Sequence, residues 1–263
     1  MLRYTREIAF GAAQVYARTA EARGAWDARL EALVVDSLVR GETEEGLQSW
    51  ASALSWSSSP VAVVAGRADG DNTEQMIEDL RVVARRARFD LLAGVHGRRL
   101  MVVVGGARDP VAAAGQLAGR FGSGPIVVGA AVPDLQSATR SAQAALAGLR
   151  VAPAWPDAPR PVAADDLLPE RAIDGDPAAR EQLVREVYEV LSGGHSLLDT
   201  VTAYLEQGSS LEATARMLFV HPNTVRYRLR RVAELTGYAP AEGRGAFALW
   251  VSIVLGRLAA KTG

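Results

Sequence analysis

The N-terminal stretch, up to about Ser55, has a helical pattern of apolar residues. Steps of four and three residues alternate along it, as in a coiled coil, at Ile8, Ala12, Val15, Thr19, Ala22 and Trp26. Such a stripe packs either on a second chain or on the chain's own domain, and the pattern leaves both open. An apolar face continues through Leu30, Leu33, Val34 and Leu38, and a second helix near residues 43–54 should fold back on the first. We therefore expect residues 1–58 to form a helical segment for dimerisation or coupling.

Residues 59–152 alternate between short β-branched runs and amphipathic stretches. Strands are predicted at residues 61–65, 90–95, 99–104 and 126–132, and helices at residues 73–88, 110–121 and 134–150. His96, Gly97 and Arg98 separate the second strand from the third, a spacing typical of a β-hairpin. The order β-α-β-β-α-β-α predicts an α/β sandwich in which helices cover an antiparallel sheet, close to the ferredoxin-like motif. The predicted fold class is therefore α+β.

A proline-rich stretch from Pro153 through Pro161 predicts a linker over residues 153–176. Every segment that follows, over residues 177–263, has a helical pattern. Short breaks separate these segments, at Gly193-Gly194, Gly208, His221-Pro222 and Gly237. The C-terminal part is therefore expected to be a compact all-α domain.

Within this domain, the stretch from Ser209 to Gly237 has the pattern of a helix-turn-helix motif. A small residue on the first helix of such a motif lets the second helix approach closely, and an aliphatic residue ten positions later fills the contact. Ala215 and Val225 fit these two positions, and Ser210 can cap the first helix. The motif places the functional surface on the helix that begins near Pro222.

The second helix of the motif carries one apolar stripe, formed by Val225, Leu229 and Val232. Because that stripe must face the core, the remaining faces present the candidate DNA-binding residues Asn223, Thr224, Arg226, Tyr227, Arg228, Arg230 and Arg231. Arginine can donate to guanine O6 and N7, and asparagine can pair with adenine. The N-terminal end of a recognition helix enters the major groove, so the first four are predicted to reach bases or nearby phosphates and the last three to touch the backbone. The alternative interpretation is a solvated arginine face without a partner.

Composition supports a local rather than a general affinity for nucleic acid. The whole chain has a net charge of -1, whereas four arginines and one glutamate give residues 223–235 a net charge of +3. The chain has no cysteine, which excludes disulfides and thiolate chemistry. The N-terminus has charges at helical spacing and no long apolar segment follows, so we expect no signal peptide, no membrane span and a cytoplasmic location.

Three stretches of the C-terminal domain closely resemble PucR-type (CdaR-type) bacterial transcription regulators. They are Leu205-Glu-Gln-Gly208, Ala213-Thr-Ala215 and the run from Leu218 to Leu229, Leu-Phe-Val-His-Pro-Asn-Thr-Val-Arg-Tyr-Arg-Leu. This family places a GGDEF-like α/β domain before the DNA-binding domain, which matches the order predicted for residues 60–150. The resemblance is nearest to actinobacterial regulators of fatty-acid synthesis genes. We expect the middle and N-terminal domains to hold a homodimer or larger assembly that binds double-stranded DNA, and the sequence leaves open a small-molecule effector of unknown identity.

A nucleotide cyclase is the rival hypothesis, because the middle domain is similar in layout to diguanylate cyclases. That chemistry needs a Gly-Gly-Asp/Glu-Glu-Phe hairpin, where this chain has His96-Gly-Arg-Arg99. The metal-binding aspartates at the end of the first strand are replaced by Ala65-Gly-Arg67, and the nearby Asp69 and Asp71 have an ordinary loop composition. We therefore expect no catalytic activity.

No metal or cofactor site is predicted elsewhere in the chain. The three histidines, His96, His195 and His221, lie in separate predicted elements without the spacing of metal ligands, and each is expected to be a solvent-exposed or capping residue. A second alternative to a transcription regulator is a non-catalytic module that binds a ligand or a protein and ends in a basic helical bundle.

Overall fold

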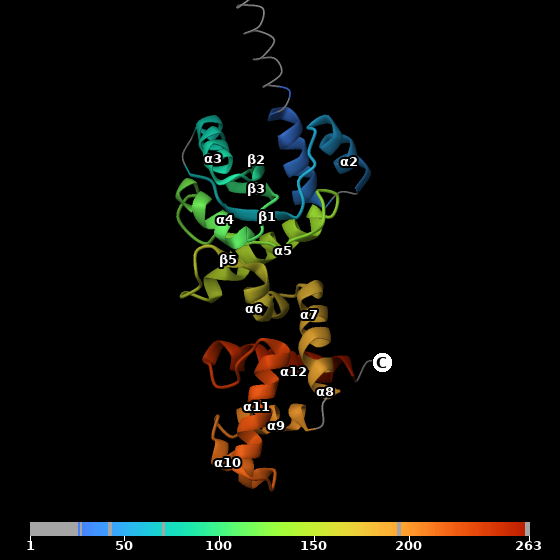
Figure 1. Cartoon of the computed structure of the whole chain (residues 1–263), viewed down its shortest axis with the longest axis vertical. Helices are drawn as coiled ribbons and strands as arrows, with labels where there is room; N and C mark the ends of the chain where they lie inside the picture. Colours follow the sequence, from blue (N-terminus) through green and yellow to red (C-terminus); the bar gives the residue numbers. More distant parts are fainter. Residues whose placement is uncertain (1–25, 27, 42–43, 70–71, 194–195, 261–263) are drawn as a thin grey trace, which may run out of the picture. The chain divides into compact units, whose positions relative to one another are not determined.

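The computed structural model of the chain describes residues 26, 28–41, 44–69, 72–193 and 196–260 (Figure 1). The predicted coiled-coil stripe before Trp26 lies outside the described residues, as do Asp71 and His195. The chain divides after Asp165 into two compact units. Each unit is described by itself below.

The first unit is built on a five-stranded sheet with the strand order β2-β3-β1-β4-β5. Its strands are β1 (Val61–Arg67), β2 (Asp90–His96), β3 (Arg99–Gly105), β4 (Val127–Val128) and β5 (Val162–Ala163). Four of them pair antiparallel, whereas β4 and β5 pair in parallel. The expected antiparallel sheet is therefore a mixed one, although the α+β fold class is confirmed.

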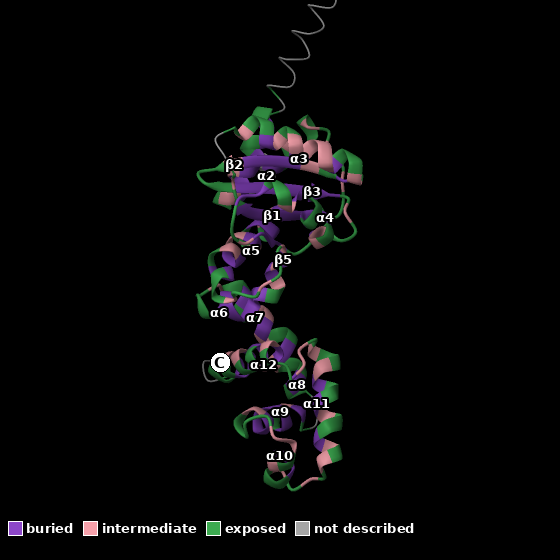
Figure 2. Ribbon diagram, turned by 90° about the vertical axis from the view of Figure 1, so that its left-hand side faces the viewer, coloured by how far each residue is buried: buried purple, intermediate pink, exposed green. Residues whose placement is uncertain are grey.

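Strand β1 lies in the middle of this sheet and is buried on both faces (Figure 2). Alternate side chains point to opposite faces, so Ala62 and Val64 join one apolar core while Val61, Val63 and Ala65 join the other. Helices α3 (Thr73–Ala87) and α4 (Pro110–Leu117) contribute to the first core. Helices α2 (Glu44–Ala53) and α5 (Ala138–Val151), together with a helix over residues 28–40, contribute to the second. The result is a sheet with helices on both faces.

The hairpin predicted between the second and third strands is confirmed, with His96 paired to Arg99 across a turn in which Gly97 has a φ of +62°. Other boundaries differ from the prediction. Of the strand expected at residues 126–132, only the two residues of β4 form a continuous ladder with neighbouring strands. Val132 adds a single isolated bridge to Val61. Helix α5 begins at Ala138 because the Asp134 carboxylate accepts a hydrogen bond from the Ser137 amide at 2.8 Å and so holds a turn ahead of the helix.

Helix α5 is tied to β1 by a buried hydrogen bond from the Val63 amide to Ser141 Oγ, at 2.9 Å. The Ser141→Ala variant leaves this amide without an acceptor, so we expect the free energy of local unfolding to fall by about 1–2 kcal/mol. Hydrogen exchange of peptides from β1 measures the change. The exposed Gln143 on the same helix offers a control, since Gln143→Ala should leave exchange in β1 unchanged. Equal protection in both variants would contradict the role of Ser141.

The segment expected to be a linker, residues 153–176, is instead divided between the two units. Val162 and Ala163 form the edge strand β5 of the first unit. Helix α6 (Leu168–Ile173) places Leu168 and Ala172 in the apolar core of the second unit. The sequence pattern could not predict these two elements, because a two-residue strand and a six-residue helix are too short to show a periodic pattern.

The second unit is all-helical, as expected. After α6 it contains α7 (Pro177–Leu183), a π-helical segment (Val184–Glu189), α8 (Val190–Ser192), α9 (Leu197–Glu206), α10 (Leu211–Met217), α11 (Pro222–Thr236) and α12 (Gly243–Ala259). One apolar core joins residues from α6 through α12. No helix within the described ranges is long and apolar enough to cross a membrane.

Candidate DNA-binding surface

Helices α10 and α11 form the predicted helix-turn-helix. The Ser210 hydroxyl accepts a hydrogen bond from the Ala213 amide at 3.3 Å and so caps α10. Ala215 and Val225 are both buried in the core of the second unit, as the spacing of ten residues requires. The two helices therefore pack through the small and the aliphatic residue that the sequence indicates.

The N-terminus of α11 is fixed by local chemistry. His221 Nδ1 accepts a hydrogen bond from the Asn223 amide at 3.1 Å, and Pro222 occupies the first turn, where its missing amide hydrogen is not needed. His221 is thus a capping residue, one of the two roles expected for it. This cap sets the direction in which the first residues of α11 leave the turn.

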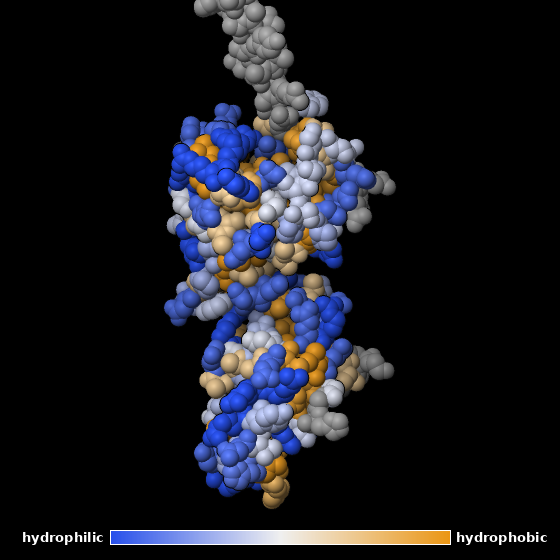
Figure 3. All heavy atoms as spheres, in the orientation of Figure 1, coloured by the Kyte–Doolittle hydropathy of each residue, from blue (hydrophilic) through white to orange (hydrophobic). Residues whose placement is uncertain are grey.

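The faces of α11 agree with the sequence pattern. Val225, Leu229 and Val232 are buried in the core. Thr224 and Arg228 are half-buried, and the exposed candidates are Asn223, Arg226, Tyr227, Arg230 and Arg231. Hydrophilic side chains lie over α11 in the lower part of Figure 3. The candidate residues therefore share one accessible surface of a single helix.

Hydrogen bonds and ion pairs give the candidate residues different contacts. Arg226 Nη1 donates to Asn223 Oδ1 at 2.6 Å, which brings together two residues predicted to read bases. Arg231 forms an exposed ion pair with Glu234, with a distance of 2.9 Å between Nη1 and Oε2. The charge of Arg226 thus lies beside the neutral side-chain amide of Asn223, whereas the charge of Arg231 is partly neutralised by the Glu234 carboxylate on the same helix.

Arg228 has a structural contact that sequence reasoning missed. Its Nη1 donates to Thr200 Oγ1 on α9 at 3.2 Å, and the same hydroxyl donates to the Ser196 carbonyl at 2.5 Å. The guanidinium therefore orients α11 on α9 as well as lying at the margin of the candidate surface. No local sequence signal could have predicted this contact, because Thr200 lies 28 residues earlier in the chain.

Two exposed residues beside α11 were also missed. Arg216 lies in the last turn of α10, where the first helix of such a motif crosses the DNA backbone. Phe219, in the turn between the helices, has 95% of its surface exposed and a φ of +54°. An aromatic residue within an apolar run is ordinarily assigned to the core, so composition alone gave no reason to place Phe219 outside it.

The end of β1, where the sequence lacks the metal-binding aspartates of a cyclase, is closely packed. A Cβ atom on Gly66, near the end of β1, would lie 2.5 Å from the Phe121 ring. The space beside the strand end is therefore occupied by an aromatic side chain. Within the described part of the chain, no three His, Asp or Glu side chains are grouped so that they could hold a metal ion.

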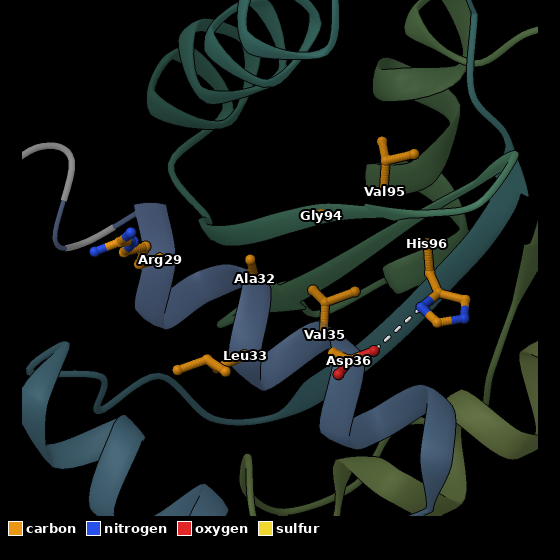
Figure 4. Close-up of a pocket in the computed structure, with 8 residues that line it drawn as sticks. All are labelled: Arg29, Ala32, Leu33, Val35, Asp36, Gly94, Val95 and His96. Carbon is orange, nitrogen blue, oxygen red and sulfur yellow. Dashed lines mark ion pairs between the residues drawn. The ribbon is translucent and has the colours of Figure 1, made fainter.

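A cavity of about 470 Å³ lies between the helix of residues 28–40 and the edge strand β2 (Figure 4). Its walls are mostly apolar, and its lining is made up of Arg29, Ala32, Leu33, Val35, Asp36, Gly94, Val95 and His96. His96 points toward Asp36, with 3.1 Å between Nδ1 and Oδ1. The volume is in the range of small-molecule sites.

Comparisons with known proteins agree with this architecture. Residues 197–255 match the PucR C-terminal helix-turn-helix domain, and residues 40–151 match the GGDEF-like domain. The chain is 43% identical, over 98% of its length, to uncharacterized proteins of Mycobacterium tuberculosis and Mycobacterium bovis, and it spans 65% of the length of those relatives.

A solved structure is similar over nearly its whole length. It is the regulator of polyketide synthase expression from Bifidobacterium adolescentis, with 32% sequence identity and a TM-score of 0.77. The match covers 88% of this chain and 93% of that one. The chain therefore belongs to the family of PucR-type regulators, in which a GGDEF-like domain is followed by a C-terminal helix-turn-helix domain.

Proposed function

We propose that this protein is a sequence-specific, DNA-binding transcription regulator. The observation that carries the proposal is the exposed N-terminal half of α11. There the side-chain amide of Asn223 accepts a hydrogen bond from the Arg226 guanidinium. Both groups can pair with base edges in the major groove, and Arg230 on the same surface can pair with phosphate. A location in the cytoplasm, with the bacterial chromosome, follows from this role.

The experiment that tests this function is the capture of genomic DNA fragments by the purified chain at two salt concentrations, followed by sequencing. We expect a few recurrent fragments that share a short repeat, because specific contacts survive salt better than phosphate contacts alone. Uniform recovery of the genome, or no recovery, would contradict the proposal. The identity of the recovered genes also tests our proposal, from the sequence resemblance, that the targets are genes of fatty-acid biosynthesis.

We further propose that the protein acts as a homodimer or larger assembly through its N-terminal helices. Trp26 is 61% exposed and Leu33 is 44% exposed, and they lie seven residues apart, which is one coiled-coil repeat. A dimer would present two recognition helices to two half-sites about one helical turn of DNA apart. Sedimentation at tens of micromolar, with and without operator DNA, checks this, and a monomer in both cases would contradict it.

A small-molecule effector is proposed for the cavity beside β2. Its apolar walls suit an apolar ligand, and the exposed Arg29 at its edge suits a ligand with one anionic group. A panel of aliphatic carboxylates should raise the melting temperature of the wild type, since a ligand that binds only the folded state stabilises it. The Arg29→Ala variant should lose most of that shift, whereas Arg86→Ala, which removes an exposed charge from α3, should keep it.

The middle domain is proposed to have no catalytic role. This is supported by the Phe121 ring at the end of β1 and by the arginines Arg98 and Arg99 in the β2–β3 hairpin. Incubation with GTP and Mg²⁺ should therefore give no cyclic dinucleotide, and a product in the wild type that is absent after heat denaturation would contradict this.

A further inference from the structure

The turn between α10 and α11 carries an aromatic ring that the fold does not use. Phe219 is 95% exposed, and Met217 beside it is 48% exposed. A phenylalanine at the surface gives up the stabilisation that burial of its ring would contribute. Exposure this complete is therefore a reason to ask what the side chain contacts outside the unit.

The backbone conformation of Phe219 is unfavourable as well. Its φ of +54° lies in the left-handed region, which glycine and asparagine adopt readily and bulky residues do not. Among the described non-glycine residues with positive φ, the others are Ser55, Arg88, Ser196 and Ser209, so Phe219 is the only apolar one. Strain of this kind persists mostly at functional positions.

The surrounding turn holds this conformation whatever the side chain. The Phe219 amide donates to the Arg216 carbonyl at 3.3 Å, and the Val220 amide donates to the Ala215 carbonyl at 3.0 Å. Glycine would make the same backbone bonds without strain. Neither burial nor turn geometry therefore explains a phenylalanine here.

The position of the ring points to DNA. Phe219 lies four residues before Asn223, on the turn that leads directly into the N-terminal end of α11. Exposed Arg216 precedes it on α10 and exposed Arg226 follows it on α11, so a polyanion that binds this surface would pass between two cations. Apolar side chains, phenylalanine included, recognise the thymine methyl group in the major groove.

Building on the proposed function, we propose that Phe219 is a specificity-determining residue that packs on a thymine methyl group beside each half-site of the operator. Each half-site then has an A·T pair at its edge, outside the bases that Asn223 and Arg226 reach. The contact carries no charge, so it changes sequence preference without changing the number of counterions released on binding.

The test uses the full chain and the operator recovered from genomic DNA. Phe219→Gly and Phe219→Asn both suit the left-handed backbone, so both should fold with an equal or higher melting temperature. We expect both to bind the operator roughly 5-fold or more weakly, with an unchanged salt slope. Arg88→Gly relieves the same kind of backbone strain in the first unit, and it should bind DNA like the wild type.

A second arm identifies the methyl group. Replacing operator thymines one at a time with deoxyuridine should weaken wild-type binding at one position per half-site, and should have no effect there on Phe219→Gly. Affinity of Phe219→Gly within twofold of the wild type, or equal deoxyuridine effects in both proteins, would overturn the inference, and the ring would then belong to a protein contact. A wild type that binds no operator would instead overturn the proposed function itself.

Discussion

Replacing Arg226 with alanine is expected to lower the affinity for the operator by about 1–3 kcal/mol, roughly 5- to 150-fold, and to relax the preference for one base pair. Arg226 is exposed in the first turns of α11 and its Nη1 donates to Asn223 Oδ1, so the guanidinium is already oriented before DNA arrives. A side chain held in place loses less conformational freedom on binding than a free one. Fluorescence titration of the operator and of single-base variants measures both effects.

Arg231→Ala is the matched control on the same helix. Arg231 is exposed but forms an ion pair with Glu234, and it lies a full turn further from the N-terminus of α11. We therefore expect this variant to reduce mainly the salt slope of binding, with little change in base preference. Wild-type affinity in both variants would contradict the assignment of α11 as the recognition helix, and equal loss of base preference in both would contradict the division of roles along it.

The candidate site could be predicted because its signals are local. The cap at Ser210, the contact between Ala215 and Val225 and the stripe that Val225 begins all lie within one stretch of 29 residues from Ser209 to Gly237. The burial of one stripe fixes the direction of every other side chain on α11. The sequence could therefore predict the buried stripe of α11 without any knowledge of the rest of the fold, although two of the seven candidates, Thr224 and Arg228, are half-buried.

What the sequence could not predict depends on contacts between distant segments. Strand β5 pairs in parallel with β4, although the whole of α5 lies between these strands in the sequence. Each of the two strands has only two residues, which are too few to form an alternating pattern. Arg228 is held by Thr200, which no spacing rule connects to it. Phe219 would be counted as core by its hydropathy, and only the turn geometry places it outside. For β5 and Arg228 tertiary packing, not local propensity, decides the outcome, whereas for Phe219 the backbone conformation of the turn decides it.

The same limit applies to the boundary between the two units. The prolines of residues 153–161 led to the expectation of a linker, yet α6, which follows, places a buried arginine, Arg171, in the second unit. The Arg171 side chain is 4% exposed, and its Nε donates to Asp176 Oδ2 at 2.9 Å. A buried charge of this kind requires a partner. The ion pair between Arg171 and Asp176 therefore holds α6 in the helical unit, together with the apolar residues of α6.

Replacing Asp176 with alanine is expected to produce the largest loss of stability among the variants considered, about 3–5 kcal/mol in the second unit. The Asp176 carboxylate pairs with buried Arg171 through Oδ2, and its Oδ1 accepts hydrogen bonds from the amides of Ala178 and Ala179 at 3.0 and 3.3 Å. The alanine variant therefore removes the Asp176 carboxylate from the buried Arg171 and removes the cap of α7. Amide exchange in α6 and α7 should become roughly 100-fold faster or more.

Two further variants separate these contributions. Asp176→Asn keeps an oxygen that can cap α7 but removes the charge, so it should retain about 1 kcal/mol of the lost stability. Asp199→Ala removes an exposed carboxylate from the first turn of α9 and should change exchange in α6 and α7 little. Because α6, α7 and α11 share one apolar core, Asp176→Ala should also lower operator binding in proportion to the unfolded fraction. Wild-type exchange in α6 and α7 of this variant would show that the pair between Arg171 and Asp176 does not stabilise the second unit.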